Sequence, residues 1–167
     1  MLERRNRRNI FSLVVAVVLL FVSCDANRVF DEYQPIEEQQ WNKHNTLRFP
    51  FEVKDSVQQH NLFISLRNNK EYAYSNLFLI ATLRFPDGNV VVDTLEYAMA
   101  DSAGKFLGRG FTDVKDNKLF YKENIVFPTK GRYTFEVRQA MRKNGEANGI
   151  EALEGVTHVG FRIEKIK

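Results

Sequence analysis

The chain has 167 residues, with 24 Lys or Arg against 21 Asp or Glu, so its formal net charge is +3. The excess lies in the first 23 residues, which hold four arginines and one glutamate; the remainder has 20 basic and 20 acidic residues. A nucleic-acid-binding domain carries a basic surface, so this neutral remainder argues against nucleic-acid binding. The single cysteine, Cys24, excludes an intrachain disulfide.

Residues 1–23 have the organisation of a secretory signal peptide. Four arginines precede an apolar run from Ile10 to Val22, which is interrupted only by Ser12. The run is shorter than the roughly 20 residues that a transmembrane helix needs, whereas a signal peptide needs only about 7–15. We expect the general secretory route, because "RRNIF" is only a fragment of a twin-arginine motif. The alternative is an uncleaved anchor with an incidental cysteine.

The end of the run, "FVSC", resembles the lipobox of bacterial lipoproteins. In such proteins the signal peptidase cuts just before the cysteine, whose sulfur carries a diacylglycerol and whose new amino terminus is usually acylated as well. Leucine usually stands three residues before the cysteine, and Phe21 takes that place here. Cys24 is therefore the predicted lipidation site and the first residue of the mature protein.

Residues 24–40 are predicted to form the lipidated N-terminus and a short tether, of which residues 25–28 are the flexible part. A pure tether would contain few aromatic residues. We therefore expect partial docking on the domain through four apolar or aromatic side chains: Val29, Phe30, Tyr33 and Ile36. The domain itself is placed at residues 41–167.

From residue 41 onward, apolar and polar residues alternate with the period of two that indicates β-strands. Strands are expected within 61–68, 74–85, 89–97, 119–127, 131–141 and 157–166. Residues 74–85 are the most apolar, as for a buried central strand. In the last two strands, the alternation points six side chains toward a core: Tyr133, Phe135, Val137, Val159, Phe161 and Ile163.

Turn signals separate these strands. "FPDG" at 85–88 places Pro and Gly where a tight turn needs them, and predicts a hairpin between 74–85 and 89–97. "FPTKG" at 127–131 predicts a second hairpin, and "RQAMRKNG" at 138–145 a single helical turn. Seven or eight strands with regular turns predict an all-β fold: a single-domain antiparallel β-sandwich of the jelly-roll type.

The sequence contains no convincing catalytic or metal-binding motif. The three histidines, His44, His60 and His158, lie far apart, whereas zinc ligands usually cluster. Carboxylate pairs such as Glu52 with Asp55, or Asp93 with Glu96, would suit a glycosidase, but acidic residues at strand ends are common. "GKFLGRG" at 104–110 lacks the order of a phosphate-binding loop. We predict no metal, no cofactor and no small-molecule ligand.

One loop combines planar hydrogen-bonding groups with aromatic rings, a mixture found in glycan sites and in protein interfaces. It contributes Arg67, Asn68, Tyr72, Tyr74 and Asn76, with Trp41 as a candidate neighbour. The plain alternative is a polar loop whose tyrosines close the end of the sandwich. A glycan site requires Trp41, Tyr72 and Tyr74 to form one exposed row or cleft.

Five collinear blocks resemble the gliding motility lipoprotein H (GldH) family of the Bacteroidota. They are "CDANRVFDEYQPI", "NLFISLRNNKEYAYSNLFL", "DTLEYAMADSAGKFLGRG", "FPTKGRYTFEVRQAMR" and "VGFRIEK". His158, before the last block, is a departure, since the family would place an acidic residue there.

The resemblance implies a lipid-anchored envelope protein required for gliding, a motion that depends on surface adhesins exported by the type IX secretion system. It supplies no catalytic residues; only Cys24, as the lipid site, transfers. Asp25 would favour the inner membrane in enterobacteria, but this phylum does not follow that rule, so the periplasmic face of the outer membrane is expected. The leading hypothesis is a non-enzymatic protein-interaction module with envelope partners, and the alternative is a glycan-binding lipoprotein.

Overall fold

The computed structural model describes residues 26–110, 113–143, 145–146 and 148–166. This part of the chain forms ten strands and one short 3-10 helix, Glu37–Gln39. The strands are β1 Arg28–Pro35, β2 Gln40–Asn42, β3 Leu47–Val53, β4 Gln59–Asn68, β5 Asn76–Arg84, β6 Val90–Ala98, β7 Lys115–Val126, β8 Gly131–Gln139, β9 Ala152–Glu154 and β10 Val156–Lys165.

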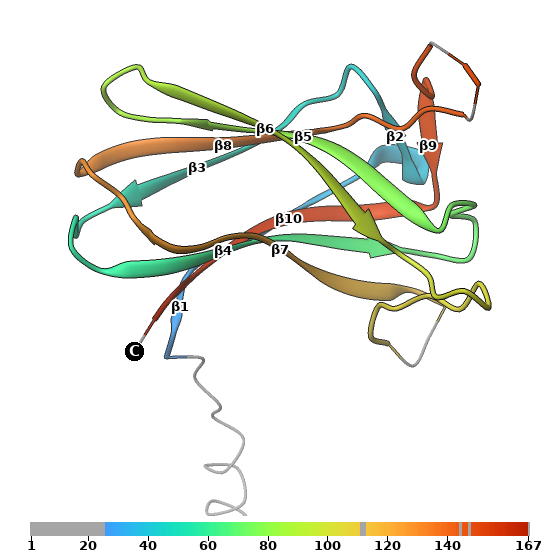
Figure 1. Cartoon of the computed structure of the whole chain (residues 1–167), viewed down its shortest axis with the longest axis horizontal. Helices are drawn as coiled ribbons and strands as arrows, with labels where there is room; N and C mark the ends of the chain where they lie inside the picture. The colour runs from blue at the N-terminus through green and yellow to red at the C-terminus, as the bar shows by residue number, and fades with distance from the viewer. Residues whose placement is uncertain (1–25, 111–112, 144, 147, 167) are drawn as a thin grey trace, which may run out of the picture.

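Eight of the strands form two four-stranded antiparallel sheets that pack face to face (Figure 1). Sheet A has the order β1-β10-β4-β7, and sheet C has the order β3-β8-β5-β6. If the two short strands β2 and β9 are left out and the remaining eight are renumbered 1 to 8 along the chain, sheet A has the order 1-8-3-6 and sheet C has the order 2-7-4-5. Each step along the chain except β5 to β6 crosses between sheets, which is the double Greek-key connection of a jelly roll. The predicted fold class is confirmed.

The core forms because the inward-facing residues of both sheets are large and apolar. The six side chains predicted from the alternation, from Tyr133 to Ile163, are all at most 1% exposed. Phe135 of sheet C stacks on Phe161 of sheet A with ring centroids 4.0 Å apart. A continuous aromatic layer therefore ties the two sheets together.

The short strands β2 and β9 pair with each other and close one end of the sandwich (Figure 1). There Trp41 lies opposite Leu153, and both side chains are fully buried. At the other end, β1 begins beside the end of β10, through the pairs Arg28 with Glu164 and Phe30 with Ile163.

The predicted turns have mixed outcomes. The hairpin at 85–88 is confirmed: Phe85 and Asn89 are hydrogen-bonded across it, and Gly88 has the positive φ of +89° that favours glycine. The hairpin at 127–131 is wrong, because β7 belongs to sheet A and β8 to sheet C. The helical turn at 138–145 is also wrong: β8 extends to Gln139, and the described residues after it form turns and an isolated bridge between Arg142 and Gly149.

The N-terminal segment is more ordered than the predicted tether. Residues 28–35 form β1, a full strand of sheet A, and Ile36 is only 5% exposed. The sandwich thus starts at Arg28 rather than at residue 41. No helix among the described residues is both long enough and apolar enough to cross a membrane.

Candidate functional site

A pocket of about 570 Å³ opens at the end of the sandwich where β1 begins and β10 ends. Strands β1, β3, β4 and β10 and the loops beside them form its walls. Because β1 and β3 are edge strands of opposite sheets, no strand of the described part of the chain closes the gap between them here. The residues that line the pocket are Val29, Phe30, Phe51, Glu52, Val53, Lys54, Asp55, Gln58, His60, Phe127, Ile163 and Lys165.

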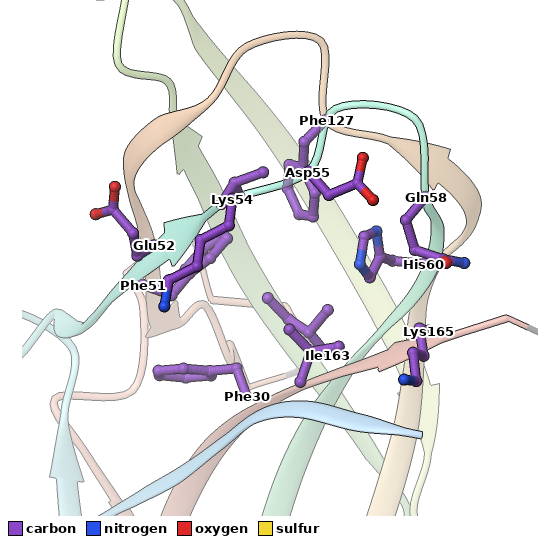
Figure 2. A pocket seen from close by; sticks show the side chains of 12 residues that line it. Phe30, Phe51, Glu52, Lys54, Asp55, Gln58, His60, Phe127, Ile163 and Lys165 are labelled. Carbon is purple, nitrogen blue, oxygen red and sulfur yellow. The ribbon is translucent and has the colours of Figure 1, made fainter. Parts of the chain in front are cut away.

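The inner surface of the pocket is aromatic. Phe51 lies 5.8 Å from Phe30 and 5.5 Å from Phe127, measured between ring centroids. In Figure 2 these rings and the side chain of Ile163 surround an open space. The same rings continue into the core, since Phe30 and Phe51 both contact Phe161. The pocket is therefore an open extension of the apolar core.

His60 is the one polar group set deep in this apolar wall, and its ring points into the space in Figure 2. The residue is 6% exposed, and its ring centroid lies 5.4 Å from that of Phe127. Its Nδ1 atom is buried without a hydrogen-bond partner among the described residues. Burial lowers the pKa of His60, against smaller raising effects of the Gln58 backbone and Asp55. The imidazole is thus neutral at neutral pH and retains unused hydrogen-bonding capacity.

Four charged residues surround the mouth of the pocket: Glu52, Lys54, Asp55 and Lys165. Asp55 accepts a hydrogen bond from the backbone of Val57. Neither lysine takes part in an ion pair with another described residue. The two positive and two negative charges balance, so the rim does not select for a strongly charged ligand.

The three aromatic residues of the glycan hypothesis do not form an exposed row. Trp41 is fully buried, and its Nε1–H donates to the carbonyl of Asn45 at 2.9 Å. Tyr72 is 2% exposed, and its hydroxyl donates to the carbonyl of Asn76 at 2.7 Å. The half-buried Tyr74 packs edge-on against Tyr72 at 5.9 Å. These residues close the end of the sandwich, as in the alternative that the sequence left open.

The polar candidates are also engaged within the protein. Arg67 stacks over Tyr33 at 4.2 Å and bonds Asp116 at 3.0 Å. Asn68 is fully buried, and its side-chain oxygen accepts a hydrogen bond from Asn117. Asn76 donates to Glu96 on β6. The predicted binding residues are thus held by contacts within the protein, and their rings do not form an exposed row.

Asp93, a member of one of the carboxylate pairs, lacks the pKa shift of a glycosidase acid. A glycosidase acid needs a raised pKa. Although partial burial raises the pKa of Asp93, hydrogen bonds from Lys122 and Tyr121 outweigh it, so the net direction is downward. Across the described part of the chain, no three His, Asp or Glu side chains gather where they could share a metal ion.

Cys24 lies outside the described residues, so its lipidation remains a prediction. Two features of the structure have no counterpart among the predicted sites: the pocket around His60 and the exposed edge strand β6. The pocket joins segments far apart in the sequence, so no local motif reveals it. The run "NVVV" does signal a strand, but it does not distinguish an edge strand from a central one.

Comparison with known proteins identifies the family. The profile of the GldH lipoprotein family matches residues 28–163. The chain belongs to the GldH lipoprotein family. A GldH homolog from Christiangramia forsetii is 51% identical over 160 residues, covering 95% of this chain and 98% of that protein. The gliding motility lipoprotein GldH of Flavobacterium johnsoniae is 49% identical, covering 92% and 94%. The resemblance to the GldH family that the five sequence blocks indicated is confirmed.

The GldH match begins at the first residue of β1 and ends two residues before the end of β10, so it covers nearly the whole sandwich. Among solved structures, an infectious bursal disease virus VP2 subviral particle gives a TM-score of 0.36 at 16% identity, and the GH115 glucuronidase BtGH115A gives 0.42 at 10%. This chain spans only 34% and 18% of those chains. Such low TM-scores carry no argument about function.

Proposed function

We propose that this protein is a lipid-anchored, non-enzymatic component of the gliding motility machinery that binds other envelope proteins. Support for the motility role comes from its family and from the names of two relatives about half identical to it. We place it at the periplasmic face of the outer membrane, in association with type IX secretion.

Cys24 is the proposed point of attachment. It follows a 13-residue apolar run and Ser23, in the order of a lipoprotein signal. Each buried methylene contributes about 0.8 kcal/mol to membrane binding, so two or three acyl chains hold the protein far more firmly than one. Cys24→Ala should leave the sandwich folded and release the protein from the membrane fraction. Unchanged membrane retention of that variant would refute the anchor.

The observation that carries the binding role is the edge strand β6. It pairs with β5 over nine residues without a register shift, and no other described strand pairs with its outer edge. Three consecutive valines on it are exposed: Val90 by 45%, Val91 by 38% and Val92 by 61%. A long, regular, apolar edge invites pairing with a strand of another chain.

The other three edges carry features that hinder such pairing. Strand β1 has a register shift near its start and ends at Pro35, and β3 contains Pro50. The pairing of β7 with β4 is shifted twice, and Asn124 on β7 has a positive φ of 54°. Prolines and bulges are the usual means of blocking an edge. Among the four edges, β6 is therefore the one open to a partner.

The partner that fits β6 is an extended segment with apolar residues at alternate positions. Such a segment adds a strand through main-chain hydrogen bonds, while its side chains set the specificity. Strand β6 contains no Lys or Arg, and of its two carboxylates Asp93 is already paired with Lys122 at 2.9 Å, whereas Glu96 has no ion pair among the described residues. A partner segment with a basic residue facing Glu96, beside its apolar positions, would therefore be favoured.

Affinity capture from envelopes tests this role. We compare the lipidated wild-type protein with Val92→Lys, which places a charge on the β6 edge, and with Val57→Lys, which places one on a residue 80% exposed in a loop. We expect a specific envelope protein to be captured by the wild type and by Val57→Lys but lost with Val92→Lys. Identical captured proteins in all three samples would refute binding through β6.

A further inference from the structure

The pocket lies beside the point where the chain leaves the sandwich toward its lipid. The carbonyl of Asn27 accepts a hydrogen bond from the backbone N–H of Lys165, a pocket residue, at 2.9 Å. Only three residue steps separate Asn27 from Cys24. An extended chain spans at most about 3.6 Å per residue, so the two Cα atoms lie within about 11 Å of each other. The acyl groups on Cys24 are thus attached close to the pocket.

We propose that the pocket accommodates one acyl chain of the protein's own lipid anchor. This inference rests on the proposed lipidation of Cys24. The aromatic walls formed by Phe30, Phe51 and Phe127 suit a hydrocarbon chain, as in ligand sites that are mostly apolar with few polar groups. The remaining acyl chains of the anchor stay in the bilayer.

The size of the pocket suits a single chain. If a methylene group occupies roughly the 30 Å³ of a water molecule in the liquid, the 570 Å³ pocket has room for about 19 methylenes. One bacterial acyl chain fits within this volume, whereas two chains do not. The pocket is therefore matched to part of a lipoprotein anchor rather than to the whole of it.

The polar groups of the pocket suit an uncharged acyl ester. Nδ1 of His60 is buried without a partner among the described residues and belongs to a ring that points into the space. In the tautomer that carries the proton on Nδ1, the ring can donate a hydrogen bond to the ester carbonyl of the chain. The balanced charges of the rim give no advantage to a fatty-acid carboxylate or an anionic headgroup. This chemistry and the short link to Cys24 favour the protein's own diacylglyceryl group over a free lipid.

Photo-crosslinking within the intact lipoprotein provides the direct test. We replace Phe127 in the pocket wall with benzoylphenylalanine, and in a control we replace Leu107, which is 56% exposed. After irradiation of cell envelopes, mass spectrometry identifies what is attached to each position. We expect the lipopeptide that begins at Cys24 to be attached to position 127 but not to position 107.

Each other outcome overturns the proposal. A phospholipid attached to position 127 would show that the pocket takes a lipid from the bilayer, and an attached protein or no adduct would exclude an acyl chain. The intact mass of the same sample shows whether Cys24 carries lipid. If Cys24 carries no lipid, the proposed anchor and the pocket proposal are both refuted. If Cys24 carries lipid but no lipopeptide is attached to position 127, only the pocket proposal is refuted.

A second measurement uses the natural sequence, in case the substitution at Phe127 disturbs folding. The mature chain produced without a signal peptide carries no lipid, yet it contains every strand of the sandwich. We titrate this form and the lipidated form with the methyl ester of cis-parinaric acid, a fluorescent acyl probe. We expect the unlipidated form to bind at least tenfold more tightly, because its pocket is vacant. Equal binding by the two forms, or no binding, would overturn the proposal.

Discussion

Replacing Phe161 with alanine tests whether the aromatic layer between the sheets holds the sandwich together. The Phe161 side chain is fully buried, and its ring stacks on Phe135 at 4.0 Å. Three further rings, those of Phe30, Phe49 and Phe51, lie within 6.4 Å of it. A Phe→Ala change in a core costs about 3–5 kcal/mol. We expect about 4–5 kcal/mol here, because strands paired in both sheets cannot collapse into the space.

Such a loss is a large part of the roughly 5–15 kcal/mol by which domains are stable. With a urea m-value of about 2 kcal/mol per molar, the unfolding midpoint should fall by about 2 M. The measurement is urea denaturation of the unlipidated mature chain, followed by tryptophan fluorescence of the buried Trp41.

Phe120→Ala serves as the matched control. Phe120 is 44% exposed on the outer face of sheet A, where its ring meets that of Phe63 edge-on at 5.4 Å. A cross-strand pair of this kind contributes about 0.2–1 kcal/mol, so the midpoint should fall by less than about 0.5 M. If the two variants lose equal stability, the central role of the stack between the sheets is refuted.

Two further predictions concern backbone crowding and acid sensitivity. Gly155→Ala should cost about 3 kcal/mol in unfolding free energy, because a Cβ at this positive-φ residue would overlap the Tyr72 backbone. Gly88→Ala, with a similar φ but open space, should cost about 1 kcal/mol by the same urea assay; equal costs would refute the overlap. The pKa of Glu136 is lowered: burial raises it, but hydrogen bonds from two arginines outweigh burial. Its stabilisation is present above the unfolded pKa of about 4.3 and is lost as the pH falls through the folded pKa. Glu136→Gln should therefore lower the urea midpoint at pH 7 and flatten the decline of the midpoint as the pH falls below about 4.3; an unchanged pH profile would contradict this.

The fold could be predicted from the sequence because strand alternation reports directly which side chains face the core. Phe161 and its neighbours in β10 illustrate this, since their inward orientation follows from a period of two. The connection at 127–131 illustrates the limit. A Pro–Gly turn signal shows that the chain reverses, but it does not show whether the next strand pairs in the same sheet or crosses to the other.

The candidate site was harder to predict because aromatic residues with a polar group serve two purposes. Trp41 and Tyr72 each have a polar hydrogen. From the sequence alone, such a residue fits an exposed glycan site as well as it fits a buried position with a backbone partner. In the structure each donates to a backbone carbonyl only four residues away, so both rings can be buried at little polar cost. His60 shows the opposite error: an unremarkable histidine in the sequence becomes a pocket residue through contacts with distant segments.

The pairing of β1 with β10 has a consequence for biogenesis. Arg28 and Glu164 are partners in the same sheet, although they lie at opposite ends of the domain sequence. Sheet A therefore cannot be completed until nearly the whole chain has crossed the membrane, and contacts of such long sequence separation form slowly. The residue proposed to receive the lipid precedes β1, so this end of the protein can be modified and held at the membrane while the rest is still unfolded. Membrane attachment would then come before folding, and the last strand to be exported would complete the domain against a first strand already fixed in place.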